Sequence, residues 1–174
     1  LMVLGMVVSG VVGLFEGIMA QLTIIVSFQS LILDMAGNVG TQSLAVTIRV
    51  LMDETLTGRQ KLELVCKEGR IGLLNGLILG AASCGVVGLY IMLVKAKTAA
   101  FAFGISGCIG VALLLAMAVS SIVGTCVPLL FKKLGVDPAV ASGPLITTLN
   151  DLTAVVAYYG LAWLLLINIF GFGA

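Results

Sequence analysis

The strongest constraint on this chain is a series of long apolar runs with few charges inside them. A helix needs about 20 apolar residues, at a rise of 1.5 Å each, to cross a hydrocarbon core of about 30 Å. We predict five transmembrane helices, in residues 1–15, 22–51, 71–94, 99–131 and 138–172, the first of them cut short. Because the runs do not alternate in polarity as barrel strands do, the predicted fold class is an all-α membrane protein.

Composition excludes most other classes of protein. Of the 174 residues 60% are hydrophobic and 10% charged, against roughly 45–50% and 25% in a soluble domain. The chain has no histidine, which removes Ser-His-Asp and Cys-His catalysis and the usual zinc sites. The net charge is +1 and the basic residues form no aromatic-interleaved patch. We therefore expect neither an enzyme nor a nucleic-acid partner, and we read the chain as a fragment of a longer membrane protein.

The lysines and arginines predict how the chain is oriented. Arg59, Lys61, Lys67 and Arg70 lie in the polar segment 53–70, and Lys132 and Lys133 follow the fourth run, whereas only Lys95 and Lys97 fall on the other side. Basic residues near the ends of spans are retained in the cytosol. The 2–3 and 4–5 connections and the amino-terminal side are therefore predicted to be cytosolic, with the carboxyl end outside a plasma membrane. Glu63 and Lys67 of this segment lie at i and i+4 and are predicted to form a surface pair on a solvated helix face.

Three acidic residues have no basic residue near them in the sequence. All nine lysines and arginines lie in connections or at span ends, but Glu16, Asp34 and Asp151 lie within or between apolar stretches. A carboxylate at membrane depth costs about 2.5–3.5 kcal/mol on insertion scales, so it is normally paired, protonated or functional. The candidates for its partner are a proton, a water-filled cavity or a metal cation. Glu16 is expected at the interface, in contact with water.

Asp34 begins a polar row along the second predicted helix. Asp34, Asn38 and Gln42 lie at positions i, i+4 and i+8, which share one helix face. Such a face must contact protein or water and not lipid. It predicts either a hydrogen-bonded ridge between helices or the lining of a hydrophilic conduit. Gly37 and Gly40 would permit close approach of another backbone or a local break.

Asp151 ends a second row, on the fifth predicted helix. Its members at i+4 spacing are Gly135, Ala139, Gly143, Thr147 and Asp151, with Thr148 and Asn150 beside them and Pro144 within the helix. Carboxylates, hydroxyls and carbonyls freed by a proline are hard oxygen donors, which suit Mg²⁺, Ca²⁺ or Mn²⁺. The alternative is a structural carboxyl that caps a neighbouring helix.

Small residues also recur at helical spacing. One ridge holds Gly5, Ser9, Gly13 and Gly17, and another holds Gly72, Gly76 and Gly80. In lipid such ridges let helix backbones approach closely. They predict tight packing within the subunit, in preference to a face for dimerisation.

Two of these segments resemble a known family. Residues 34–49, DMAGNVGTQSLAVTIR, resemble the glycine-asparagine-x-glycine-x-glutamine signature on the second helix of the MgtE family of magnesium channels. Residues 135–151, GVDPAVASGPLITTLND, resemble the fifth helix of that family. Asp34 and Ala36 depart from the glycine-rich approach to the asparagine that is associated with the family.

The resemblance implies a homodimer with five helices per subunit and one central pore lined by helices 2 and 5 of both copies. It implies that residues 1–174 form the transmembrane pore domain, that the conducted ion is Mg²⁺, and that Asp151 is the ion-recognition carboxylate. Cytosolic amino-terminal and CBS domains precede this part in the family. The expected partners are thus a second copy, the lipid bilayer and those domains.

The predicted function is Mg²⁺-selective transport by a homodimeric channel that recognises a hydrated ion. The metal-contacting residues are predicted to be Asp151 and, from the polar row alone, Asp34. The residues predicted to line the pore are Asn38, Gln42, Gly143, Thr147, Thr148 and Asn150. Two alternatives remain open, a proton-coupled divalent-cation exchanger and a membrane scaffold that does not transport.

Overall fold

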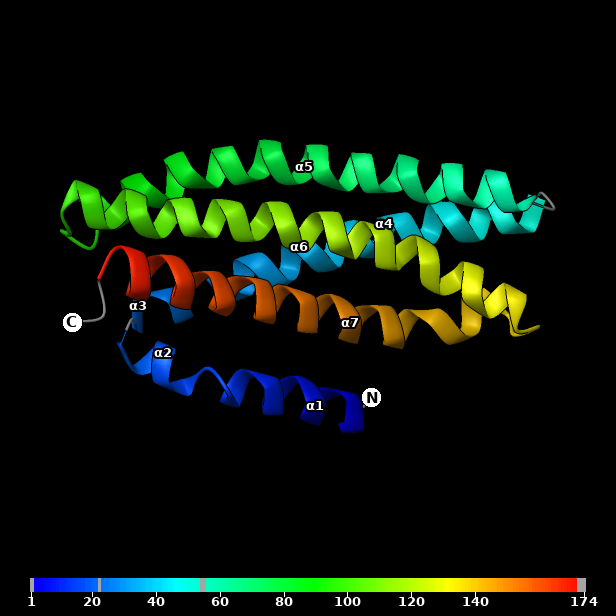
Figure 1. The fold of residues 1–174 in the computed structure, drawn as a ribbon, viewed down its shortest axis with the longest axis horizontal. Coiled ribbons are helices and arrows are strands. Elements are labelled where there is room, and N and C mark those ends of the chain that lie inside the picture. Colours follow the sequence, from blue (N-terminus) through cyan, green and yellow to red (C-terminus); the bar gives the residue numbers. More distant parts are fainter. Residues whose placement is uncertain (1, 22, 54–55, 172–174) are drawn as a thin grey trace.

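The computed structural model describes residues 2–21, 23–53 and 56–171, and these residues form a bundle of helices (Figure 1). The helices are α1 (Met2–Gly13), α2 (Glu16–Gln21), α3 (Thr23–Val26), α4 (Gln29–Asp53), α5 (Gly58–Leu93), α6 (Ala99–Lys133) and α7 (Pro138–Leu161). A π-helical segment, Ala162–Ile169, continues α7. The predicted all-helical fold is confirmed for this part of the chain.

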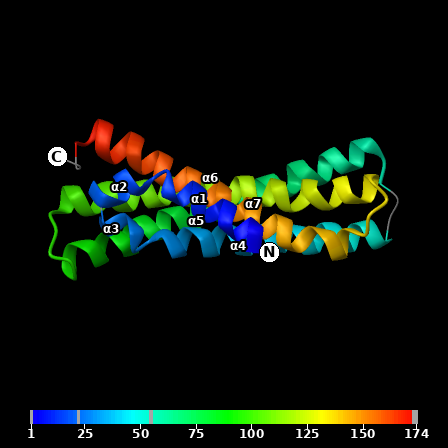
Figure 2. The same cartoon turned by 90° about the horizontal axis from the view of Figure 1, so that it is seen from below.

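Four stretches of the described chain are long and apolar enough to cross a membrane. They are Thr23–Met52, Gly58–Leu93, Ala99–Lys133 and Gly143–Ile169. The first predicted span is occupied by α1, an apolar helix of 12 residues that is shorter than the roughly 20 residues a crossing needs. The helices α1 and α2 lie along the outer side of α7 (Figures 1 and 2).

Helix α6 is the centre of the bundle. It packs against α4, α5 and α7, and most of its apolar window is buried, unlike those of the other spans. The antiparallel pair α5 and α6 runs side by side along almost its whole length (Figure 1). The positions of α4 and α7 are therefore set by how these helices pack on α6.

Glycines allow this close packing. A Cβ atom at Gly76 would lie 2.8 Å from Cα of Leu114, and one at Gly80 would lie 2.6 Å from the Gly110 carbonyl oxygen. Gly72 faces Ser121 on α6 in the same way. The ridge Gly72, Gly76 and Gly80 thus packs within the subunit, as predicted. The amino-terminal ridge does not pack in this way, because a Cβ at Gly5 of α1 or at Gly17 of α2 would meet nothing within 4 Å.

The charged segment before the third span is helical. Helix α5 begins at a capping box, in which the Thr57 side chain accepts from the Gln60 backbone N–H while the Thr57 backbone N–H donates to Gln60 Oε1. Over 36 residues α5 is about 54 Å long, well beyond the ~30 Å of a hydrocarbon core, so its charged first turns extend past the apolar belt.

One charged residue of this segment, Glu68, is buried. Glu68 is only 3% exposed, because it lies on the row of α5 that faces α6. Its carbonyl oxygen accepts a hydrogen bond from the Ser121 hydroxyl, which also lies 2.8 Å from the Ser43 hydroxyl of α4. The predicted solvated face of Glu63 and Lys67 is exposed, but the i,i+4 row that buries Gly72 and Gly76 also includes Glu68.

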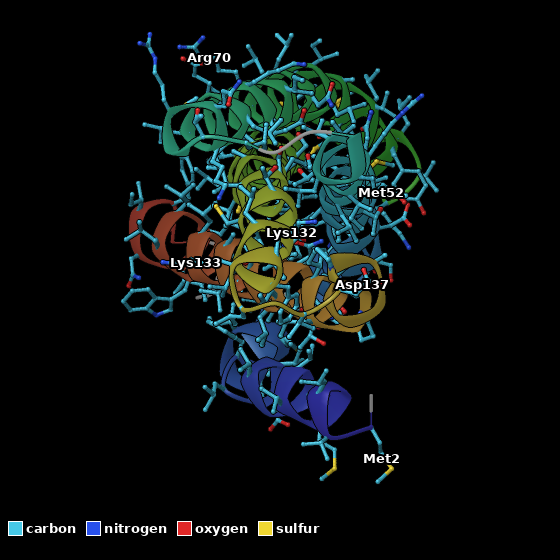
Figure 3. All side chains as sticks on the ribbon, turned by 90° about the vertical axis from the view of Figure 1, so that its right-hand side faces the viewer. Met2, Met52, Arg70, Lys132, Lys133 and Asp137 are labelled. Atoms are coloured by element: carbon cyan, nitrogen blue, oxygen red, sulfur yellow. The ribbon has the colours of Figure 1, made fainter. Side chains whose placement is uncertain are left out.

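Basic side chains gather at one end of the bundle. Both the α4–α5 and the α6–α7 connections lie at that end, and the α5–α6 connection with Lys95 and Lys97 lies at the other (Figure 1). Figure 3 looks onto this end and labels Lys132, Lys133 and Asp137 near the α6–α7 connection, with Arg70 of α5 pointing away from the bundle. The 2–3 and 4–5 connections thus lie at the same end of the bundle, and which side of the membrane that end faces stays a prediction.

The second predicted span is interrupted near its start. The backbone turns at Ser27 and Phe28, between α3 and α4. Two tyrosines of α7 hold the interruption: the Tyr158 hydroxyl donates to the Ile25 carbonyl at 2.8 Å, and the Tyr159 hydroxyl donates to Gln29 Oε1 at 2.6 Å. The carboxyl end of α7 is thereby fixed against the amino end of α4.

The turn into α7 corrects the predicted row on that helix. Gly135 has a φ of +74°, and it ends α6 in a left-handed turn where the Val136 N–H donates to the Phe131 carbonyl. Helix α7 then begins at Pro138, with Asp137 as its N-cap. Gly135 therefore lies outside the helix and does not share a face with Thr147 and Asp151.

We predict that Gly80→Ala destabilises the bundle by about 1–3 kcal/mol, since the added methyl meets the Gly110 carbonyl and backbone cannot move aside cheaply. Thermal unfolding in detergent, followed by circular dichroism, measures the change. The control is Gly85→Ala on the same helix, where a Cβ meets nothing within 4 Å. Equal midpoints for the two variants would contradict the packing described.

Candidate functional site

The polar row of α4 lies on the outer surface of the subunit. Asp34, Asn38 and Thr41 are exposed, and the Asn38 amide donates to Asp34 Oδ2 at 3.3 Å. The Thr41 hydroxyl donates to the Gly37 carbonyl at 2.9 Å, so its own oxygen remains available as an acceptor. The row is therefore not buried between helices of this chain, and its role as a conduit lining or as a ridge against another chain stays a prediction.

Helix α7 presents a second set of oxygen atoms. Thr147 is exposed and donates to the Gly143 carbonyl at 3.2 Å, while Asp151, one turn further along, is half-buried. Pro144 lies within the helix, and the Thr148 hydroxyl donates to its carbonyl at 3.0 Å. Thr147 and Asp151 therefore form the accessible polar edge of α7.

The two helices bring these groups together in one open groove of about 280 Å³. Its lining consists of Leu33, Asp34, Gly37, Asn38, Thr41, Thr147 and Asp151. The groove thus unites both acids that were predicted to contact metal, although they come from distant parts of the sequence. Asn38 and Thr147, predicted to line a pore, are also in it.

The charge of the groove is negative. Among residues 2–21, 23–53 and 56–171 the one ion pair joins Arg59 and Glu63, at 2.9 Å, on the charged end of α5. Asp34 accepts from a neutral amide instead. Two carboxylates, an amide and two hydroxyls therefore face one space, a donor set that suits a hard cation and its hydration water.

Four residues predicted to line the pore lie elsewhere. Gln42 is exposed on α4 and Gly143 is half-buried, but neither is among the groove residues. Thr148 is 9% exposed and Asn150 is fully buried, so both point into the subunit. Their assignment to the pore lining stays a prediction, since the structure describes one subunit.

Sequence reasoning missed Thr41 and Gly37 as lining residues. Thr41 lies seven positions after Asp34, which is two helical turns and the same face, so the spacing that identified Asn38 also contained Thr41. It also missed a contact behind the groove: a Cβ at Gly40 would lie 2.8 Å from Cγ of Asn150. The predicted close approach is confirmed at Gly40 but not at Gly37, where a Cβ would meet nothing within 4 Å. A local break is not found, because α4 is continuous over both residues.

The fold and the groove define a class: a helical membrane protein with four candidate spans that carries acidic and hydroxyl side chains along one polar groove. The MgtE family model, described as a divalent cation transporter, matches residues 29–161, which include all of the groove. The chain belongs to the MgtE family.

Curated relatives agree with this assignment. The chain is 38% identical over 162 residues to the magnesium transporter MgtE of Enterococcus faecalis, covering 93% of this chain and 34% of that protein. It is 33% identical over 162 residues to the protein of the same name from Bacillus subtilis, with the same coverage. For the magnesium transporter MgtE of Thermus thermophilus the identity is 34% over 169 residues, covering 95% and 35%. The chain spans about a third of the length of these relatives.

We predict that a thiol at Thr147 reacts with a charged, membrane-impermeant methanethiosulfonate reagent much faster than a thiol at Thr148. The variants are Thr147→Cys and Thr148→Cys in a background without the four native cysteines, of which Cys66 and Cys126 are exposed. Only a wetted thiol ionises and reacts. Labelling followed by mass spectrometry measures the rates, and a slow Thr147→Cys variant would place this edge of α7 in lipid.

Proposed function

We propose that this chain is the ion-conducting membrane part of a Mg²⁺ channel, in which Asp151 recognises the hydrated ion. The observation that carries the proposal is the groove between α4 and α7, where Asp34 and Asp151 share one space without a cationic side chain. A passing divalent cation would compensate these charges. Membership of the MgtE family and the similarity to named magnesium transporters support the choice of ion.

A second copy of the chain would complete the conduit. The groove is shallow, and the polar row of α4 is exposed at a depth where lipid would not solvate it. We propose a homodimer of five-span subunits in which α4 and α7 of both copies surround one pore. The apolar helix α1 then belongs to the first of the five spans.

The charge of such a pore would select by valence. If two copies of Asp151 lie about 6 Å apart, they repel each other by about 3 kcal/mol at an effective dielectric constant of 20. A divalent ion about 4.5 Å from each carboxylate, through a water, gains about 7 kcal/mol per contact on the same scale. A monovalent ion gains half as much, before the cost of dehydration in either case.

Selection by size would depend on hydration. Mg²⁺ gives up its octahedral shell of water reluctantly, whereas Ca²⁺ accepts about six to eight flexible oxygen ligands. Asn38, Thr41 and Thr147 offer amide and hydroxyl groups that can hydrogen-bond to the waters of a hydrated ion. A pore of this lining favours the ion that keeps its shell, so Mg²⁺ is proposed to be recognised through outer-shell contacts.

The topology gives transport a direction. We propose that the charged end of the bundle faces the cytosol, with the amino-terminal side there and the carboxyl end outside the plasma membrane. Inward movement then gains about 2.3 kcal/mol per elementary charge per 100 mV. The cytosolic amino-terminal and CBS domains of the whole protein are proposed to act at this end.

We predict that Asp151→Asn in the full chain abolishes Mg²⁺ uptake, because the neutral amide removes the charge that attracts a divalent ion. Uptake into proteoliposomes that contain a Mg²⁺-sensitive dye measures the effect. Glu63→Gln is the matched control, since Glu63 lies on the exposed charged end and pairs with Arg59. Unchanged uptake by assembled Asp151→Asn protein would remove Asp151 from ion recognition, whereas vesicles with the unmodified full chain that take up no more Mg²⁺ than protein-free vesicles would favour the scaffold alternative.

We predict that Asp34→Asn distinguishes the role of Asp34 from that of Asp151. If Asp34 contacts the ion, its loss also lowers uptake, and the apparent affinity for Mg²⁺ falls. Unchanged uptake would reduce Asp34 to a hydrogen-bond acceptor for Asn38.

We also predict that the current reverses at the equilibrium potential of Mg²⁺ at any pH gradient. A channel carries no coupled proton, so a pH step across the bilayer leaves the reversal potential unchanged. Planar-bilayer recording measures it. A reversal potential that follows the proton gradient would instead support the proton-coupled exchanger.

A further inference from the structure

Three residues interlock directly behind the groove. A Cβ on Gly40 of α4 would lie 2.8 Å from Cγ and 2.9 Å from Oδ1 of Asn150 on α7. Helix α6 also contacts α4 here: a Cβ on Gly124 would overlap the Gly40 carbonyl oxygen and lie 3.2 Å from Cβ of Ser43. The backbone of α4 at Gly40 is thus in close contact with both α6 and the Asn150 side chain.

The Asn150 side chain fills space at this crossing and does not bridge it by hydrogen bonds. It is fully buried, and neither Nδ2 nor Oδ1 has a hydrogen-bond partner among the described residues. Leaving a buried amide unsatisfied costs free energy, so the side chain does not add to stability through its polarity. Its volume against Gly40 sets how closely α7 can approach α4.

The same two helices carry the groove on their outer side. Asn150 directly precedes Asp151, and Gly40 lies between Asn38 and Thr41, which both line the groove. A change in the approach of Gly40 and Asn150 therefore moves Asp151 relative to Asn38 and Thr41. Close-packed interiors transmit such shifts, because they cannot absorb an added atom without movement.

We infer that Asn150 is a positioning residue, whose contact with Gly40 sets the width of the ion groove and so the preference for Mg²⁺ over Ca²⁺. This inference rests on the proposed function, because it assumes that Asp151 recognises the ion. Hydrated Mg²⁺ has a fixed octahedral shell, whereas Ca²⁺ adapts its coordination to the ligands it meets. A change in groove width therefore penalises Mg²⁺ more than Ca²⁺.

The test is a double-substitution cycle in the full chain, reconstituted into proteoliposomes. Gly40→Ala adds a methyl where the Asn150 amide lies, and Asn150→Ala vacates that space. Each single variant is expected to raise the half-saturating Mg²⁺ concentration and to lower the Mg²⁺/Ca²⁺ uptake ratio by about tenfold, equivalent to ~1.4 kcal/mol. The double variant is expected to recover most of both quantities, since the added and removed atoms compensate.

Gly124→Ala provides the matched control for general loosening of the bundle. The nearest atoms to its added methyl belong to the Gly40 backbone and to Ser43, and not to Asn150, so Asn150→Ala is expected not to rescue it. Gly85→Ala, with open space around its Cβ, is expected to behave as the unmodified chain. Rescue of Gly124→Ala as complete as that of Gly40→Ala would overturn the inference, because it would show a structural role without site specificity.

Two further outcomes are decisive. If Gly40→Ala does not yield folded protein, Asn150→Ala and Asn150→Ser alone serve as the test, and an unchanged Mg²⁺/Ca²⁺ ratio in both overturns the inference. Failure of the proposed function is recognised separately, by normal uptake in Asp151→Asn. Loss of uptake in Asp151→Asn together with unaltered selectivity in the Gly40 and Asn150 variants would reject only the positioning role.

Discussion

Close contact between helix backbones at glycine is the interaction on which the rest of this structure depends. Lipid is as apolar as the helix surfaces, so helices in a bilayer associate through packing and not through the hydrophobic effect. Gly76 and Gly80 bring α5 onto the backbone of α6, and Gly124 brings α4 onto it from another side. Helix α6 becomes the buried centre, and α4 and α7 are left with outward faces.

Those outward faces carry the polar groups of the chain. A polar row costs least free energy where it meets water or another protein, so its exposure on the isolated subunit indicates a surface that is covered or wetted in the membrane. Asp34 and Asp151 lie on that surface with amide and hydroxyl neighbours, whereas the basic side chains lie at the two ends of the bundle. This separation of charge is what makes the groove suited to a cation. The contact of Gly40 with Asn150 fixes the same two helices from behind.

Much of the fold was predictable from local pattern. The apolar runs predicted the spans that α5, α6 and α7 occupy, because the length of an apolar run is a direct consequence of bilayer thickness. The break at Ser27 and Phe28 was not predictable, since it is held by Tyr158 and Tyr159 from a helix far along the chain. The burial of Glu68 was missed for a related reason: a charged stretch reads as solvated unless its facing helix is known.

The candidate site, too, was predictable from the sequence only in part. Helical spacing alone placed Asp34 with Asn38 and Thr147 with Asp151, because residues four apart share a face in any α-helix. The proposal that the ion is Mg²⁺ came from the resemblance to the MgtE family. Neither helical spacing nor the family resemblance showed that Thr147 faces the groove while Asn150 is buried against Gly40. That difference is set by the rotation of α7 about its own axis.

The sequence by itself determined that this chain is a set of apolar helices in which Asp34 and Asp151 stand far from any basic residue along the chain, since hydropathy and charge are properties of each segment alone. Only the tertiary structure decided which faces meet. That choice depends on the close approach of glycines to particular side chains and carbonyl oxygens on other helices, which no single segment encodes.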